Sequence, residues 1–149
     1  MDDAREIENL IYRYAELIDS GELQGLAELF AKGEIISREH NTQISGTENV
    51  LKLYRNSCRI YESTGTPRTK HLTTNVIIEK TGPDHAAARS YYTVLQSTES
   101  LPLQAIITGR YIDTFEKRNG AWTFKTREMV IDNIGDCSAH LLYDTTSLQ

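Results

Sequence analysis

Hydrophobic residues recur at helical spacing in the first third of the chain and predict three helices. The first spans residues 5–18, where one apolar stripe consists of Ile7, Leu10, Ile11, Tyr14, Leu17 and Ile18. After a break at residues 19–23, a second, short helix is predicted over 22–31, with a core face of Leu23, Leu26, Leu29 and Phe30. A third helix, for which Thr47 is a favourable N-cap, continues to about residue 62 with an apolar side of Val50, Leu51, Tyr54, Cys58 and Tyr61.

The remaining segments have the pattern of strands. A short strand is predicted over 33–38, and longer strands are predicted over 70–80, 85–96, 103–118 and 121–132. Asn119 and Gly120 separate the last two strands, and this pair favours a tight hairpin because both residues tolerate positive φ. Helices followed by antiparallel strands predict an α+β fold, with the helices packed on one face of a curved, mostly antiparallel sheet.

A histidine lies in the first long strand, within the sequence TKHLTTNV (residues 69–76). A period of two divides this strand into two faces, His71, Thr73 and Asn75 against Leu72, Val76 and Ile78. Ile77 continues the face of His71, so apolar residues occupy both faces, whereas a strand that is solvated on one side alternates more cleanly. The pattern therefore predicts that His71 points into the interior.

Composition and charge restrict the class of protein. The chain has 149 residues, of which 39% are hydrophobic and 25% charged, and we expect one globular domain over residues 1–149. The net charge of −5 argues against a nucleic-acid partner or an anionic membrane surface. No apolar run approaches the ~20 residues of a membrane helix, and the acidic N-terminus does not resemble a signal peptide. Cys58 and Cys137 are far apart in sequence, so we expect free thiols and a cytoplasmic protein.

Three segments together resemble the SnoaL-like family of the nuclear transport factor 2-like superfamily: IYRYAELIDSGELQGLAELF (11–30), KHLTTNVII (70–78) and GRYIDTFEKRNGAWTFKTR (109–127). This branch includes scytalone dehydratase, bile-acid dehydratase and a dehydrochlorinase. The resemblance implies a cone-shaped α+β barrel in which a bent sheet wraps a helix around an internal pocket.

The resemblance also implies candidate catalytic residues. In these relatives an Asp at the end of the first helix pairs with a His at the start of a strand, and the matching positions are Asp19 and His71. Tyr14, five residues before the Asp, and Arg127, five residues after the Trp of the last strand, also match. Tyr54 and Tyr92 are expected as pocket walls. Where the dehydratases carry a further Asp or His, this chain has tyrosines at 91 and 92.

These residue types suit proton abstraction. A neutral imidazole accepts a proton near neutral pH, because its unperturbed pKa is about 6.5. A carboxylate on the other ring nitrogen fixes the tautomer, and a phenol or guanidinium can stabilise a developing oxyanion. The implied reaction is removal of a proton next to an activating group, followed by elimination, isomerisation or ring closure. We expect no metal and no organic cofactor, because metal-ligand spacings and nucleotide-binding motifs are absent from the sequence.

Each assignment has a structural alternative. Asp19 with Glu22 is an acidic variant of a capping box for the second helix. His71 can be solvated, and Tyr14 can be a core residue whose hydroxyl has one partner. Arg127 lies on the same side of its strand as the polar Lys125, which suggests that it is exposed, and as apolar residues further along, which suggests that it is buried. A bulge between them would change the answer, so the pattern leaves both possibilities open.

The candidate residues and the resemblance are consistent with two alternative functions. The first is a cofactor-independent lyase or isomerase, dehydratase-like or cyclase-like, which acts on a mostly apolar cyclic small molecule in a hydrophobic pocket. The alternative is a non-catalytic binding or assembly module that resembles the small subunit of ring-hydroxylating oxygenases. Strand 103–118 has apolar residues on both faces, Leu103, Ala105, Ile107, Tyr111 and Phe115 against Ile106 and Ile112. One helix layer cannot cover both faces, so we predict a homodimer.

Overall fold

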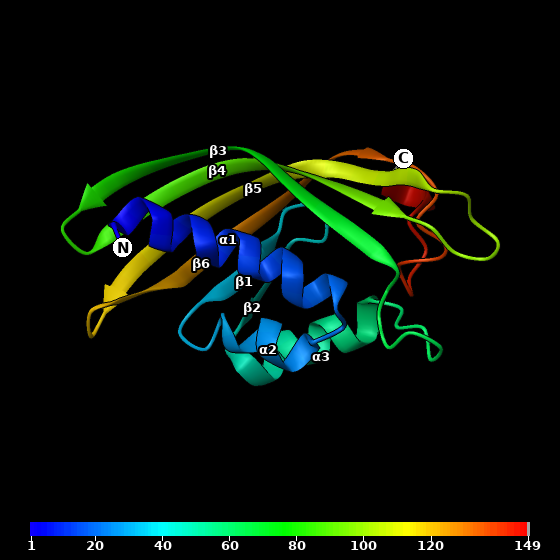
Figure 1. Cartoon of the computed structure of the whole chain (residues 1–149), viewed down its shortest axis with the longest axis horizontal. Helices are drawn as coiled ribbons and strands as arrows, with labels where there is room; N and C mark the ends of the chain where they lie inside the picture. Colours follow the sequence, from blue (N-terminus) through cyan, green and yellow to red (C-terminus); the bar gives the residue numbers. More distant parts are fainter. Residues whose placement is uncertain (149) are drawn as a thin grey trace.

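The computed structural model describes residues 1–148, which form three α-helices, six strands and a short 3-10 helix. In chain order these are α1 (Asp3–Asp19), α2 (Leu23–Glu28), β1 (Glu34–Ser37), β2 (Thr42–Ser45), α3 (Thr47–Ser57), β3 (Thr69–Gly82), β4 (His85–Gln96), β5 (Gln104–Arg118), β6 (Ala121–Ile134) and η1 (Thr146–Leu148). The predicted α+β fold is confirmed. Figure 1 shows the strands as one curved layer, with α1 along its concave side and α2 and α3 next to each other below α1 in this view.

The sheet has the strand order β2-β1-β6-β5-β4-β3. Neighbouring strands are antiparallel except β1 and β6, which pair in parallel. The sheet does not close into a barrel, because β2 and β3 remain as its two edges, so the predicted cone is open. The predicted hairpin between β5 and β6 is confirmed, with φ of 50° at Asn119 and 81° at Gly120.

α1 supplies the helical half of the core. Asp2 caps the helix by accepting a hydrogen bond from the backbone N–H of Arg5 at 2.8 Å. The buried stripe agrees closely with the predicted one and contains Ile7, Ile11, Tyr14, Leu17 and Ile18. This stripe contacts the concave side of the sheet, so the C-terminal end of α1 lies against the start of β3.

A bulge in β3 overturns part of the reasoning about its faces. The register shifts between Thr74 and Ile77, and Asn75 within the bulge has φ of 55°. His71 and Thr73 therefore share the inner face with Val76 and Ile78, whereas Leu72 and Ile77 are 44% and 40% exposed on the other. The prediction that His71 points inward is correct, but the argument from Ile77 is wrong because the bulge reverses the parity between them.

Other local predictions also need correction. Helix α3 begins after Gly46, which has φ of 82°, so Thr47 is the first helical residue and not the N-cap. This helix ends at Ser57, because the next residue, Cys58, is extended and pairs with Leu141 of the C-terminal segment. Strand β2 was not predicted, and its residues are mostly exposed. Ile106, expected on the same face of β5 as Ile112, is fully buried whereas Ile112 is 39% exposed, and the register with β4 shifts beside Ile106.

Candidate active site

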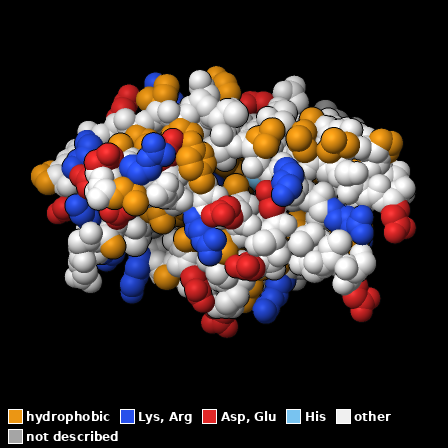
Figure 2. All heavy atoms as spheres, in the orientation of Figure 1, with side chains coloured by type: hydrophobic (Ala, Val, Ile, Leu, Met, Phe, Trp, Pro, Cys, Tyr) orange, Lys and Arg blue, Asp and Glu red, His pale blue; other side chains and the backbone are white. Residues whose placement is uncertain are grey.

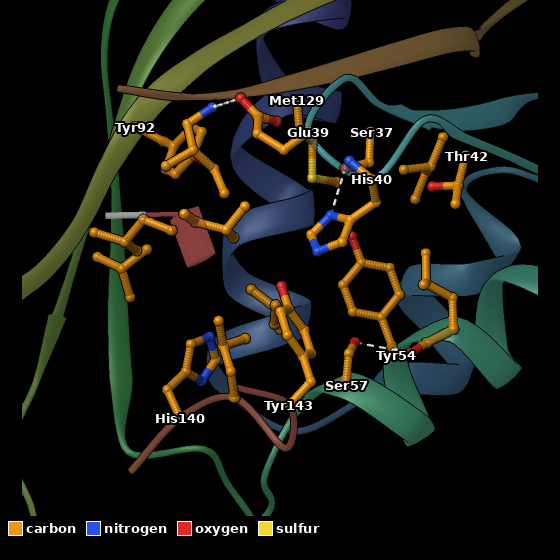
Figure 3. A pocket seen from close by; sticks show the side chains of 18 of the residues that line it. Ser37, Glu39, His40, Thr42, Tyr54, Ser57, Tyr92, Met129, His140 and Tyr143 are labelled. Atoms are coloured by element: carbon orange, nitrogen blue, oxygen red, sulfur yellow. Dashed lines mark hydrogen bonds between the residues drawn. The ribbon is translucent and has the colours of Figure 1, made fainter. Parts of the chain in front are cut away.

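A cavity of about 610 Å³ lies between the concave side of the sheet, α1, α3 and the C-terminal segment. Its walls are mainly apolar, with Ile18, Val94 and Ile107 among the lining residues, and its polar groups come mostly from histidine and tyrosine side chains. Figure 3 shows side chains from distant parts of the chain, including Tyr54, Tyr92 and His140, around one open space. The volume is typical of small-molecule sites, which range from ~300 to 1,000 Å³.

The structure brings Asp19 and His71 together at the edge of this cavity. Asp19 is the last residue of α1, and His71 is the third residue of β3, which α1 contacts. The Nδ1 of His71 lies 2.7 Å from Oδ1 of Asp19, and the backbone N–H of His71 donates to Oδ2 at 2.8 Å. The hydroxyl of Thr69 also donates to Oδ1, at 2.8 Å. The side chains are 6% exposed for His71 and 15% for Asp19.

These contacts determine the tautomer of His71. A carboxylate only accepts hydrogen bonds, so in the neutral form of this imidazole the proton is on Nδ1 and the lone pair is on Nε2. Burial by itself raises the pKa of Asp19, but the hydrogen bonds from His71 and Thr69 outweigh it, and the net direction is downward. Asp19 is therefore ionised at neutral pH and stabilises a positive charge on the imidazole.

The geometry also excludes the capping interpretation of Asp19. Helix α2 begins after Glu22, and no described side chain forms a capping hydrogen bond there. Both carboxylate oxygens of Asp19 instead accept hydrogen bonds from β3. The carboxylate is therefore bound to the start of β3 and not to the start of the second helix.

Tyr14 and Tyr54 form a hydroxyl pair in the cavity wall. Tyr14 comes from the buried stripe of α1 and Tyr54 from α3, and their hydroxyl groups are joined by a hydrogen bond. Burial raises the pKa of both phenols, so both remain protonated. Because the pair has two protons and the bond between them uses one, the second proton is available to another acceptor.

Tyr92 also lines the cavity, as expected, and its ring stacks on that of Tyr111 with centroids 4.5 Å apart. Gly109 makes this position possible. A Cβ at Gly109 would lie 2.5 Å from the ring of Tyr92 and 2.1 Å from the carbonyl oxygen of Val130. The absence of a side chain at residue 109 therefore fixes where the Tyr92 ring lies.

Arg127 is not a lining residue of the cavity. It is opposite Asp113 on the neighbouring strand, and its Nε and Nη2 donate to the two carboxylate oxygens at 2.9 Å each. Both side chains are completely buried. The guanidinium carbon lies 3.7 Å from the ring centroid of Tyr111 and 4.4 Å from that of Tyr14, so the charge is behind the tyrosine wall. Burial alone lowers the pKa of Arg127, but the Asp113 carboxylate outweighs it and raises the pKa.

Sequence reasoning did not identify several further polar groups of the cavity, and His140 and Glu39 are two of them. His140, from the segment after β6, has its ring centroid 6.1 Å from that of His71. Glu39, from the β1–β2 connection, accepts a hydrogen bond from the backbone N–H of Ile131 at 2.8 Å. Nothing in the local pattern around residues 39 or 140 distinguishes them from surface residues, because both lie outside the predicted helices and strands.

Within residues 1–148, no three His, Cys, Asp or Glu side chains are grouped so as to hold a metal ion.

The open, curved sheet over a helix and the cavity between them have the nuclear transport factor 2-like fold, which a similar solved structure shares. A family model described as a SnoaL-like domain matches residues 1–128, so the chain belongs to the SnoaL-like family. No curated protein matches this sequence. No helix within the described residues is long and apolar enough to cross a membrane.

Several solved structures are similar to this chain. One is a putative scytalone dehydratase from Novosphingobium aromaticivorans, with a TM-score of 0.71 and 27% identity, covering 90% of this chain and 87% of that one. A nuclear transport factor 2-like protein with a cystatin-like fold from the same organism has a TM-score of 0.73 and 22% identity, covering 92% and 86%. A Mycobacterium tuberculosis protein of unknown function has a TM-score of 0.72 and 23% identity, covering 91% and 75%.

Proposed function

We propose that this protein is a cofactor-independent lyase or isomerase in which His71 removes a proton from a mostly apolar cyclic molecule. The observation that supports this proposal best is the Asp19–His71 pair, joined at 2.7 Å at the edge of a largely apolar cavity. The similarity to a protein named as a putative scytalone dehydratase supports the same class of reaction. The apolar walls favour a ring-shaped carbon skeleton, such as a polyketide, a steroid or an aromatic-pathway intermediate.

The chemistry follows from the tautomer. Nε2 of His71 accepts a proton from a carbon next to a carbonyl group, and the C–H electron pair forms a carbon–carbon double bond while the carbonyl electrons move to oxygen. Asp19 stabilises the resulting imidazolium through Nδ1. The proton then returns to another atom of the substrate, as in isomerisation, or departs with a leaving group, as in elimination. A positioned base of this type contributes about 10²–10⁴-fold to the rate.

The tyrosine pair is assigned to substrate binding. The unused proton of the Tyr14–Tyr54 pair donates a hydrogen bond to an oxygen of the substrate. Tyr92 provides a flat wall for the ring skeleton, held in place by its stacking on Tyr111. Arg127, which the sequence suggested as a direct participant, acts on substrate only through the tyrosines that cover it.

We further propose a homodimer that forms through the outer face of the sheet. Exposed apolar side chains meet on this face, where Ile77 and Ile112 both neighbour Arg89 in the register of the sheet. Leu72 and Tyr91, 44% and 53% exposed, extend this apolar area. Figure 2 shows a row of hydrophobic side chains at the upper right of the visible face, and elsewhere on this face hydrophobic side chains are interspersed with charged ones.

A cytoplasmic location is proposed from the two buried, free thiols of Cys58 and Cys137.

The alternative is a non-catalytic binding module. It would use the same cavity to hold a ligand, and the dyad would serve only to join α1 to β3. The enclosure of His71 beside the cavity favours the enzyme, because a buried imidazole with a free lone pair is not needed to connect two elements.

The two alternatives differ in what His71→Ala does. Cyclic ketones and alcohols that raise the melting temperature should first be identified, because a ligand of the folded state stabilises it. These compounds are then assayed for conversion by the wild type, by His71→Ala and by His85→Ala, a control at an exposed histidine of β4. If the protein is an enzyme, the wild type and His85→Ala should convert at least one compound and His71→Ala should not. Ligand binding without conversion of any compound by the wild type would favour the binding module.

A further inference from the structure

His140 is a buried histidine for which the dyad leaves no role. Its side chain lies in the cavity wall and the residue is 5% exposed. The Nδ1 of His140 is enclosed, and no residue among 1–148 forms a hydrogen bond with it. Nδ1 is shielded from solvent as well as from the polar groups of the chain, so a molecule in the cavity that His140 lines can reach this ring only through its other nitrogen, Nε2.

The backbone around His140 is held firmly although it belongs to a segment without regular structure. The backbone carbonyl of Ala139 accepts hydrogen bonds from the hydroxyl of Tyr61 at 2.6 Å and from Nε2 of Gln96 at 3.0 Å. The carbonyl of His140 accepts from the backbone N–H of Arg59 at 2.8 Å. These bonds come from β4 and from the loop after α3, so the ring position is set by the folded structure and not by a free tail.

The position of the ring relative to His71 indicates what it contacts. The two ring centroids are 6.1 Å apart and the ring planes are inclined at 70°. A carbonyl oxygen and the carbon that loses its proton are separated by only two bonds. One ketone unit can therefore contact His71 through its carbon and His140 through its oxygen.

We propose that His140 donates a hydrogen bond to the oxygen next to the carbon from which His71 removes the proton. This inference rests on the proposed function of the same cavity and names the residue that binds the carbonyl oxygen of the substrate. During the reaction the C–H bond breaks, its proton moves to His71, and negative charge develops on the oxygen. His140 remains uncharged throughout and keeps its proton.

The electrostatics of the site agree with a neutral donor. Burial, together with the neighbouring His71, lowers the pKa of His140 to about 4, so this imidazole is uncharged near pH 7. A neutral imidazole has one N–H donor and one acceptor nitrogen. An uncharged donor does not repel the imidazolium that forms on His71, whereas a second cation at this distance would oppose its formation.

The test compares two probes that differ by one oxygen, 1-tetralone, a bicyclic ketone, and tetralin, the corresponding hydrocarbon. Dissociation constants are measured by ligand-observed NMR for the wild type and for His140→Leu, His140→Gln and His85→Leu. We expect His140→Leu to reduce the preference for the ketone over the hydrocarbon by about three- to tenfold, the value of one hydrogen bond. His140→Gln, which keeps an N–H donor, should restore part of this preference, and the exposed-site control should leave it unchanged.

Two results would overturn the proposal. One is an unchanged preference in His140→Leu, and the other is a wild type that binds neither probe, because the cavity then does not admit the ring ketone that both imidazoles contact. The proposed function fails separately. If His140→Leu loses ketone preference but the wild type does not exchange the α-hydrogens of 1-tetralone or of any other cyclic ketone that it binds, the binding role of His140 stands and proton abstraction by His71 does not.

Discussion

Arg127 and Asp113 form a fully buried ion pair, and its disruption separates a structural role for Arg127 from a chemical one. Both side chains are completely inaccessible to solvent and are joined by two hydrogen bonds of 2.9 Å. Replacing Arg127 by Met leaves the Asp113 carboxylate buried without its partner. The removal of one member of such a pair costs about 3–5 kcal/mol. A domain of this size is stable by roughly 5–15 kcal/mol, so this loss is a large fraction of the total.

The measurement is urea unfolding and thermal unfolding, both followed by the fluorescence of Trp122, the one tryptophan of the chain, which is buried on β6. A loss of 3–5 kcal/mol lowers the melting temperature by about 6–20 °C at this chain length. The double variant Arg127→Met with Asp113→Leu should recover much of the loss, because it leaves no unpaired charge.

A matched control lies on the outer face of the same sheet. Arg110 donates to both carboxylate oxygens of Asp132 at 3.0 to 3.2 Å, but the side chains are 42% and 39% exposed. Arg110→Met should therefore cost at most about 1 kcal/mol. If Arg127→Met costs no more than Arg110→Met and instead abolishes turnover, Arg127 acts in the chemistry and the structural interpretation is wrong.

Three further predictions concern the dyad, His140 and assembly. Asp19→Asn should lower kcat by about 10²–10⁴-fold in the assay of the compounds found by thermal shift, because the imidazolium loses its carboxylate; a wild-type rate would contradict the dyad. The pKa of His140 falls from its ordinary value of 6.5 to about 4 on folding, so the unfolded chain binds the proton first. Stability should therefore decrease as pH falls from 6.5 towards 4, by on the order of 3 kcal/mol in urea titrations, and His140→Leu should remove this component. Light scattering at micromolar concentration should give twice the chain mass, and Ile112→Glu on the outer face should give a monomer; a monomeric wild type would refute the dimer.

The sequence predicted the regular elements well because period-2 and helical patterns depend on local burial. The sequence could not predict β-bulges, and the bulges are the reason why several predictions about strand faces were wrong or left open. The bulge at Asn75 reverses the faces of β3, so the inward direction of His71 was correct while the supporting argument from Ile77 was not. A register shift between β5 and β6 at Lys125 similarly removes the ambiguity about Arg127, which shared parity with that exposed lysine and is nonetheless buried.

The candidate site was predicted only where residues lie on regular elements. Asp19 and His71 were paired by resemblance, and the packing of α1 against β3 brings them together. His140 gave no signal, because its position depends on hydrogen bonds from Tyr61 and Gln96 to the preceding residue, which are distant in sequence. Long-range contacts of this kind are not encoded in any local pattern.

Proton abstraction by His71 is the central claim, and hydrogen–deuterium exchange tests it without knowledge of the natural substrate. The protein is incubated in D₂O with 1-tetralone and a panel of other cyclic ketones, and loss of the α-hydrogen signal is followed by NMR. The wild type and His85→Ala should accelerate exchange of at least one ketone over the buffer rate, and His71→Ala should not. Equal exchange by the wild type and His71→Ala would contradict the assignment of His71 as the base.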